Sequence, residues 1–290
     1  MKHIALAGLI CAGLAACQTP DNTQSAAPMM DADAPVWRTV APENLLLIKT
    51  RHGQSVIELN PDFARQHVAQ FRALASAKVY NGEAFYRVID GFVAQGGLED
   101  EETIAAHPTL ENENDRALTS AGFVPLGNAD LFAEEVGHID GFPVGRSAEL
   151  GREWLLHCPG ALAMARDESP DSGGTEFYIV LDAQRYLDRN LTVFGRVIDG
   201  MQYVQKLKRG DRAIESGVLQ APDKGDTILS MQIASDMPEA DRPTYRVMAT
   251  SSAAFEAAKT AKRVRAEAFF YRTPPKVLDI CGFETPVEKD

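Results

Sequence analysis

The chain has 290 residues, of which 45% are hydrophobic, and a formal net charge of −12 at pH 7. It is long enough to bury one sizeable core. The acidic balance and the lack of a tract rich in lysine or arginine argue against nucleic acid and anionic membrane surfaces as partners. No apolar run reaches the roughly 18–20 residues that a membrane span requires.

The first residues have the layout of a secretory signal. A basic start (Lys2, His3) precedes an apolar stretch and the small residues that end in the sequence LAAC at Cys17. This ending resembles the lipobox of bacterial lipoproteins, in which the cysteine is lipidated and becomes the new N-terminus. We therefore expect a signal peptide over residues 1–16 and a lipid on Cys17. A plain cleaved signal and an uncleaved anchor are the alternatives.

Residues 17–35 are polar, small and interrupted by proline, which is typical of a flexible tether. Gln18 follows the cysteine, where an aspartate often causes retention at the inner membrane. We expect a monomer that is anchored by its lipid to the periplasmic face of the bacterial cell envelope, at the outer membrane rather than the inner one.

Two cysteines remain once the signal is removed and Cys17 is lipidated, namely Cys158 and Cys281. Because the periplasm is oxidising, we expect these two to form a disulfide. The alternative is two separate buried thiols, since free cysteine is among the residues most often found in cores.

The next part of the chain reads as strands and one helix. Residues 45–59 predict two strands around a turn. A helix is expected from Asn60, a good N-cap, to a stop at Asn81-Gly82. A further strand covers residues 85–97.

Residues 98–153 look rich in loops, with only a short helix possible over 128–136. After this insertion, three short runs over 160–166, 176–181 and 192–200 are rich in β-branched and aromatic residues and predict strands. A second helix is expected over 199–210, and a last strand over 226–235.

The pattern as a whole predicts a mainly β protein. Short strands at close intervals, with two helices, indicate a closed antiparallel barrel capped by helices, over residues 36–235. Residues 236–290 are too few for a separate domain, so we expect a C-terminal appendage with a helix over 251–272 that is capped by a serine, followed by an extended segment.

The sequence contains no GxSxG, HExxH or CxxC motif and no phosphate-binding loop. Its histidines are scattered without the spacing of metal ligands. We therefore expect neither a metal nor a cofactor.

Two segments carry a family resemblance. FYRVIDGFVAQGG (85–97) and GALAMARDESPDSGGTEFYIVLDAQRYLDRNLTVFGRVIDGMQYVQKL (160–207) strongly resemble the cyclophilins, which are peptidyl-prolyl cis–trans isomerases (rotamases). The resemblance runs from about Leu45 to Ala234. It implies an eight-stranded antiparallel barrel with a helix at each end, and proline-containing segments of unfolded or exported proteins as partners.

The resemblance also implies the site residues. Arg87 matches the family's catalytic arginine, and Gln95 matches the glutamine of the segment that follows it. The substrate-binding positions are matched by Phe92, Val93, Ala165, Arg166, Glu176, Tyr178, Tyr186, Leu187 and Leu191.

These residue types suit an isomerase. Rotation of an X–Pro bond breaks no covalent bond, and its obstacle is amide resonance, with a barrier of about 18–20 kcal/mol. An apolar pocket of Phe92, Val93, Tyr178 and Leu187 would hold the proline ring. Arg87, which is always protonated, would donate a hydrogen bond to the amide nitrogen as its lone pair returns.

Four positions depart from the family pattern. Glu176 stands where a glutamine is usual, and a carboxylate there is expected to pair with Arg87 or Arg166. Tyr186 replaces the tryptophan of cyclosporin-sensitive members, Leu191 replaces a residue with a polar edge, and Tyr86 replaces a frequent histidine.

The leading hypothesis is a periplasmic prolyl isomerase and folding chaperone for exported proteins. The first alternative is a membrane-tethered module that binds proline segments with little turnover. Glu176 and Leu191 favour this alternative, because they depart from the family pattern. The second is a purely structural envelope lipoprotein, which would leave Arg87 unexplained.

Overall fold

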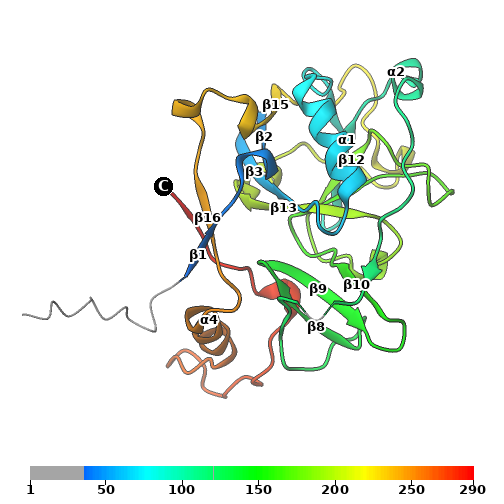
Figure 1. Ribbon diagram of the computed structural model, residues 1–290. Coiled ribbons are helices and arrows are strands. Elements are labelled where there is room, and N and C mark those ends of the chain that lie inside the picture. Colours follow the sequence, from blue (N-terminus) through cyan, green and yellow to red (C-terminus); the bar gives the residue numbers. More distant parts are fainter. Residues whose placement is uncertain (1–35, 120) are drawn as a thin grey trace, which may run out of the picture. The chain divides into compact units, whose positions relative to one another are not determined.

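The structure is a computed structural model that describes residues 36–119 and 121–290 (Figure 1). The expected signal peptide, the tether and Cys17 lie outside these residues. No helix in the described part of the chain has both the length and the apolar character needed to cross a bilayer.

An antiparallel sheet of nine strands carries most of the chain between Leu45 and Ile233, and it confirms a mainly β fold. Its strand order is β14-β4-β5-β12-β11-β13-β3-β2-β15. The bounds are β2 Leu45–Thr50, β3 Gly53–Leu59, β4 Ala84–Val88, β5 Val93–Gly97, β11 Ala161–Met164, β12 Phe177–Val180, β13 Val193–Asp199, β14 Asp226–Thr227 and β15 Ser230–Ile233.

The sheet is curled, and its two outermost strands are consecutive in the chain. Ile228 N–H donates to the Glu83 carbonyl at 2.8 Å, and Leu229 N–H donates to the Lys49 carbonyl at 2.8 Å. The single strand predicted over 226–235 is therefore divided into β14, which pairs with β4, and β15, which pairs with β2. Because of this division the curled sheet has nine strands, where the sequence predicted eight.

Helix α1 (Arg65–Ser76) packs Val68, Phe71 and Leu74 against the concave face of the curled sheet. The helix begins later than predicted, because Asn60 Oδ1 accepts from Phe63 N–H and caps a turn instead. The first helical amides of Gln66 and His67 donate to the Glu113 carboxylate, a distant residue that supplies the cap.

The second predicted helix is much shorter than expected, since α3 spans only Met201–Val204. Beyond it, the Arg209 guanidinium donates to the carbonyls of Gln205 and Leu207. The other short helices are α2 Glu101–Ala105 and the 3-10 turns η1 Pro42–Asn44, η2 Arg185–Leu187, η3 Glu215–Gly217, η4 Ala234–Asp236, η5 Glu239–Asp241 and η6 Ile280–Gly282.

The insertion over residues 98–153 is rich in loops, as predicted, but it also holds strands that were not predicted. It contains a five-stranded sheet in the order β6-β10-β9-β8-β7, and residues 128–136 form no helix. The bounds are β6 Arg116–Ala117, β7 Val124–Pro125, β8 Glu135–Ile139, β9 Phe142–Ser147 and β10 Arg152–Leu155.

Glycines inside this small sheet explain why its sequence reads as a loop. A Cβ on Gly145 would lie 2.7 Å from Trp154 Nε1, and one on Gly137 would lie 2.3 Å from the Val124 carbonyl oxygen. Close packing therefore requires the residue that usually signals a turn.

The chain ends form a third sheet, in which β16 (Tyr245–Met248) lies between β1 (Trp37–Thr39) and β17 (Val287–Lys289). In Figure 1, β1 and β16 run side by side. Helix α4 (Ala253–Arg263) starts at the predicted serine cap, Ser252, but ends before residue 272. The C-terminal appendage thus contributes strands as well as a helix.

A buried cluster joins the C-terminal segment to the insertion. Phe255 of α4 and Phe283 pack with Val136 and Trp154 of the small sheet. Cys158 and Cys281, both in contact with this cluster, form the disulfide expected from the sequence.

Candidate active site

Arg87 on β4 and Gln95 on β5 are direct partners in the sheet. Arg87 Nη1 donates to Gln95 Oε1 at 3.0 Å, and Arg87 Nε donates to the Ser216 carbonyl at 2.9 Å. The guanidinium carbon lies 5.7 Å from the centre of the Phe92 ring. Partial burial lowers the pKa of Arg87, yet an arginine remains protonated. The site therefore holds one fixed cation beside an aromatic ring.

The hydrogen bonds continue from Gln95 to a carboxylate. Gln95 Nε2 donates to Tyr86 Oη at 2.8 Å, and the Tyr86 hydroxyl donates to Glu176. The expected pairing of Glu176 with Arg87 or Arg166 was thus wrong, because Tyr86 reaches the carboxylate across the sheet. Arg166 instead donates to the Asn190 carbonyl at 2.9 and 3.0 Å.

Glu176→Gln tests the cost of keeping this carboxylate partly buried. Burial raises the pKa of Glu176 above its ordinary value. A carboxyl whose pKa is raised in the folded state contributes stability at low pH, and that contribution falls as the pH rises through the folded pKa. We expect the free energy of unfolding of the variant, relative to that of the unmodified protein, to increase as the pH rises through the folded pKa of Glu176. Urea unfolding at a series of pH values measures it, and a difference that is independent of pH would contradict it.

Three apolar side chains of the predicted pocket, Phe92, Val93 and Tyr178, gather on the convex face of the curled sheet, whereas Leu187 lies on the turn η2 outside this cluster. Side chains alternate between faces along a strand, so Tyr178 faces outward while its neighbours Phe177 and Ile179 enter the main core. Tyr178 is the register partner of Gln95, and it clusters with Val93. Phe92, Ala165 and Leu191 are half-buried against the same cluster.

The insertion packs on part of this face. Phe142, Val144 and Leu155 of the small sheet join the cluster that contains Val93 and Tyr178. Val93 and Tyr178 are accordingly only 2% and 4% exposed, so the structure places both in the core beneath the insertion. Arg87, Phe92 and Gln95 remain half-buried and accessible at the edge.

A buried network that sequence reasoning missed holds Tyr178. The Tyr178 hydroxyl lies 2.9 Å from His157 Nε2, and His157 Nδ1 lies 3.1 Å from Asp188 Oδ1. Asp188 follows η2, the turn that carries Tyr186 and Leu187, and Arg185 of that turn donates to Asp188 Oδ2 at 2.6 Å. Tyr178 and the turn η2, which carries Leu187, are therefore held by the same chain of hydrogen bonds.

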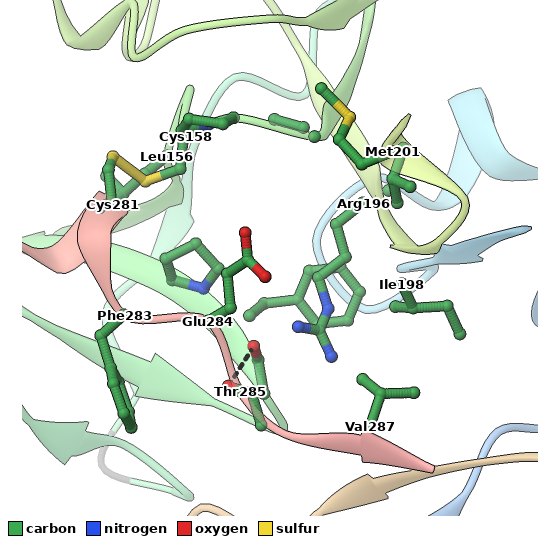
Figure 2. A pocket seen from close by; sticks show the side chains of 18 of the residues that line it. Leu156, Cys158, Arg196, Ile198, Met201, Cys281, Phe283, Glu284, Thr285 and Val287 are labelled. Atoms are coloured by element: carbon green, nitrogen blue, oxygen red, sulfur yellow. Dashed lines mark hydrogen bonds between the residues drawn. A yellow bond between two sulfur atoms is a disulfide. The ribbon is translucent and has the colours of Figure 1, made fainter. Parts of the chain in front are cut away.

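A cavity of about 430 Å³ lies elsewhere, between β13, the insertion and the C-terminal segment (Figure 2). Arg196 and Glu284 both line it, and the Cys158–Cys281 disulfide lies at its edge. Arg196 Nη2 pairs with Glu58 at 3.0 Å. None of the predicted isomerase-site residues lines this cavity.

Comparison with known proteins gives the same family from sequence and from structure. The profile of the family described as "Cyclophilin type peptidyl-prolyl cis-trans isomerase/CLD" matches residues 45–233. A probable peptidyl-prolyl cis-trans isomerase of Brucella suis is 35% identical over 185 residues, which are 63% of this chain and 80% of that protein. Peptidyl-prolyl cis-trans isomerase B of Escherichia coli is 28% identical over 200 residues, covering 66% of this chain and all of that one.

A solved structure resembles the described chain more widely. The cyclophilin AquaCyp293 of Hirschia baltica superposes with a TM-score of 0.73 at 29% identity, covering 87% of this chain and 93% of the other. The fold and these matches define an enzyme of the peptidyl-prolyl cis–trans isomerase class. The chain belongs to the cyclophilin family, whose members bind proline-containing peptides.

Proposed function

We propose that this isomerase accelerates X–Pro rotation in exported proteins, and that Arg87 stabilises the twisted amide. The observation that supports the mechanism is the Arg87 guanidinium, which is held in place beside the half-buried Phe92 ring. Arg87 Nη1 donates a hydrogen bond to the Gln95 side chain, and Arg87 Nε donates one to the Ser216 carbonyl. Among the described residues Nη2 has no hydrogen-bond partner, so it is available to the substrate.

The catalytic step needs only this donor and the pocket. A planar X–Pro amide delocalises the nitrogen lone pair, and twisting returns the pair to nitrogen. A guanidinium that donates to the nitrogen stabilises the twisted state more than the planar one, which is the condition for raising kcat. Phe92 and Leu187 hold the ring while the bond turns.

The competing function is a low-turnover binding module or chaperone. The burial of Val93 and Tyr178 beneath the insertion favours it, because a covered pocket floor restricts how a proline enters. Turnover of a short X–Pro peptide by a form that begins at Gln18 distinguishes the two. The isomerase proposal requires catalysis well above the uncatalysed rate, whereas the binding module requires saturable binding without it.

The location at the envelope rests on Cys17. A Cys17→Ala form should lose its acyl mass and leave the membrane fraction, since no apolar segment of the tether can replace a lipid anchor. Mass spectrometry and membrane fractionation measure both effects. The lipoprotein proposal fails if this form is still processed normally and stays bound to membranes.

A further inference from the structure

A turn of the insertion is fixed against η2, the turn that carries Tyr186 and Leu187. Asp130 Oδ1 accepts from the N–H groups of Phe132 and Ala133 at 2.9 and 3.0 Å, which closes the turn on itself. Both oxygens of Asp130 also accept from Arg185, at 3.0 and 3.1 Å. A bidentate pair of this kind fixes orientation as well as distance.

The η2 turn is itself firmly held. Arg185 is 6% exposed and donates to Asp188, whose carboxylate also lies against the fully buried His157. Arg185 therefore joins the turn of the insertion and the turn η2 to one buried network of hydrogen bonds. These bonds fix the distance between the two turns.

The two turns present apolar side chains to solvent. Leu131 is 95% exposed, Tyr186 60% and Phe132 53%. The guanidinium carbon of Arg185 lies 5.3 Å from the centre of the Phe132 ring, and Tyr186 stands between Arg185 and the pocket residue Leu187. Exposed apolar side chains on a rigidly held part of the chain are typical of an interaction surface.

Two features indicate what kind of molecule binds at Leu131, Phe132 and Tyr186. Arg185, which binds the turn of the insertion, and Leu187, which the proposed function places beside the proline ring, belong to the same turn η2, so a chain bound at Leu187 passes close to Phe132. The nearby carboxylates, Asp130 and Asp188, are both paired with Arg185, so the surface favours apolar rather than charged side chains.

We propose that Leu131, Phe132 and Tyr186 form an apolar extension of the substrate groove. It binds apolar side chains that flank the X–Pro bond in an extended client segment, and it gives the enzyme a preference for hydrophobic unfolded sequences. This inference rests on the proposed function, which places the proline beside Leu187.

The test compares two X–Pro peptides, one flanked by leucines on both sides and one flanked by serines. In the double variant Leu131→Ser/Phe132→Ser, the ratio of kcat/KM for the leucine peptide over the serine peptide should fall about 10-fold, because two apolar contacts are lost. The fall should lie mainly in KM. A matched control is Phe269→Ser/Tyr271→Ser, which removes two aromatic side chains that are 87% and 90% exposed outside this surface.

The proposal is overturned if the ratio equals that of the unmodified protein, or if the control lowers it equally. Failure of the proposed function has a different signature. In that case the unmodified protein turns over neither peptide, and the inference falls with it.

Discussion

Arg87→Ala is expected to lower the turnover of an X–Pro peptide about 100-fold or more, as the loss of one preorganised transition-state donor does elsewhere. The fold should persist, since the side chain is half-buried and its hydrogen bonds go to one side chain and one carbonyl. Initial rates of the variant and the unmodified protein at saturating peptide measure the effect on kcat.

Arg212 offers a matched control for this change. Its guanidinium carbon lies 5.5 Å from the centre of the Phe92 ring, close to the 5.7 Å of Arg87. Arg212 is exposed and is not hydrogen-bonded to Gln95, so Arg212→Ala should alter kcat far less. Equal losses in the two variants would indicate that positive charge near the ring, rather than a positioned donor, is what matters.

The second large effect is expected from the Cys158–Cys281 bond. The two residues are 123 apart in the sequence, so the chain-entropy model gives at most about 5 kcal/mol of stabilisation, on the order expected for a loop of this length. The bond links the residues before β11 to the C-terminal segment, which otherwise holds to the insertion through the cluster around Phe255 and Phe283. Breaking it should lower the free energy of unfolding by a few kcal/mol.

Urea unfolding of the unmodified protein, with and without reductant, isolates the bond without removing either side chain. The double variant Cys158→Ala/Cys281→Ala serves as the control, since reductant should leave its midpoint unchanged. Two alkylatable thiols on the unfolded, unreduced chain would show that the bond is absent from the protein in solution.

Much of the curled sheet is predictable because local patterns decide it. The alternation along residues 45–59 and the second family segment place β2, β3 and β11 to β13 where the structure has them. The single strand expected over 85–97 was wrong, because the chain turns back between Val88 and Val93 and forms the antiparallel pair β4 and β5. Arg87 and Gln95 are recognised from their motif, and their pairing follows from two neighbouring antiparallel strands.

The contacts that the sequence does not reveal join residues far apart in the chain. Glu113 caps α1 from the insertion, and Tyr86 draws Glu176 away from the arginines. His157 resembles any core histidine in the sequence, yet it connects Tyr178 to Asp188. The small sheet of the insertion is hidden by its glycines, which close packing demands.

The central claim is that this chain turns the X–Pro bond through Arg87 rather than merely holding it. Uncatalysed X–Pro isomerisation takes tens to hundreds of seconds, so exchange NMR on a short X–Pro peptide with a catalytic amount of protein reports the enzyme directly. We expect exchange peaks between the cis and trans proline resonances with the unmodified protein, and their loss with Arg87→Ala. Shifted peptide resonances without exchange peaks, from the unmodified protein, would contradict the claim and identify a binding module.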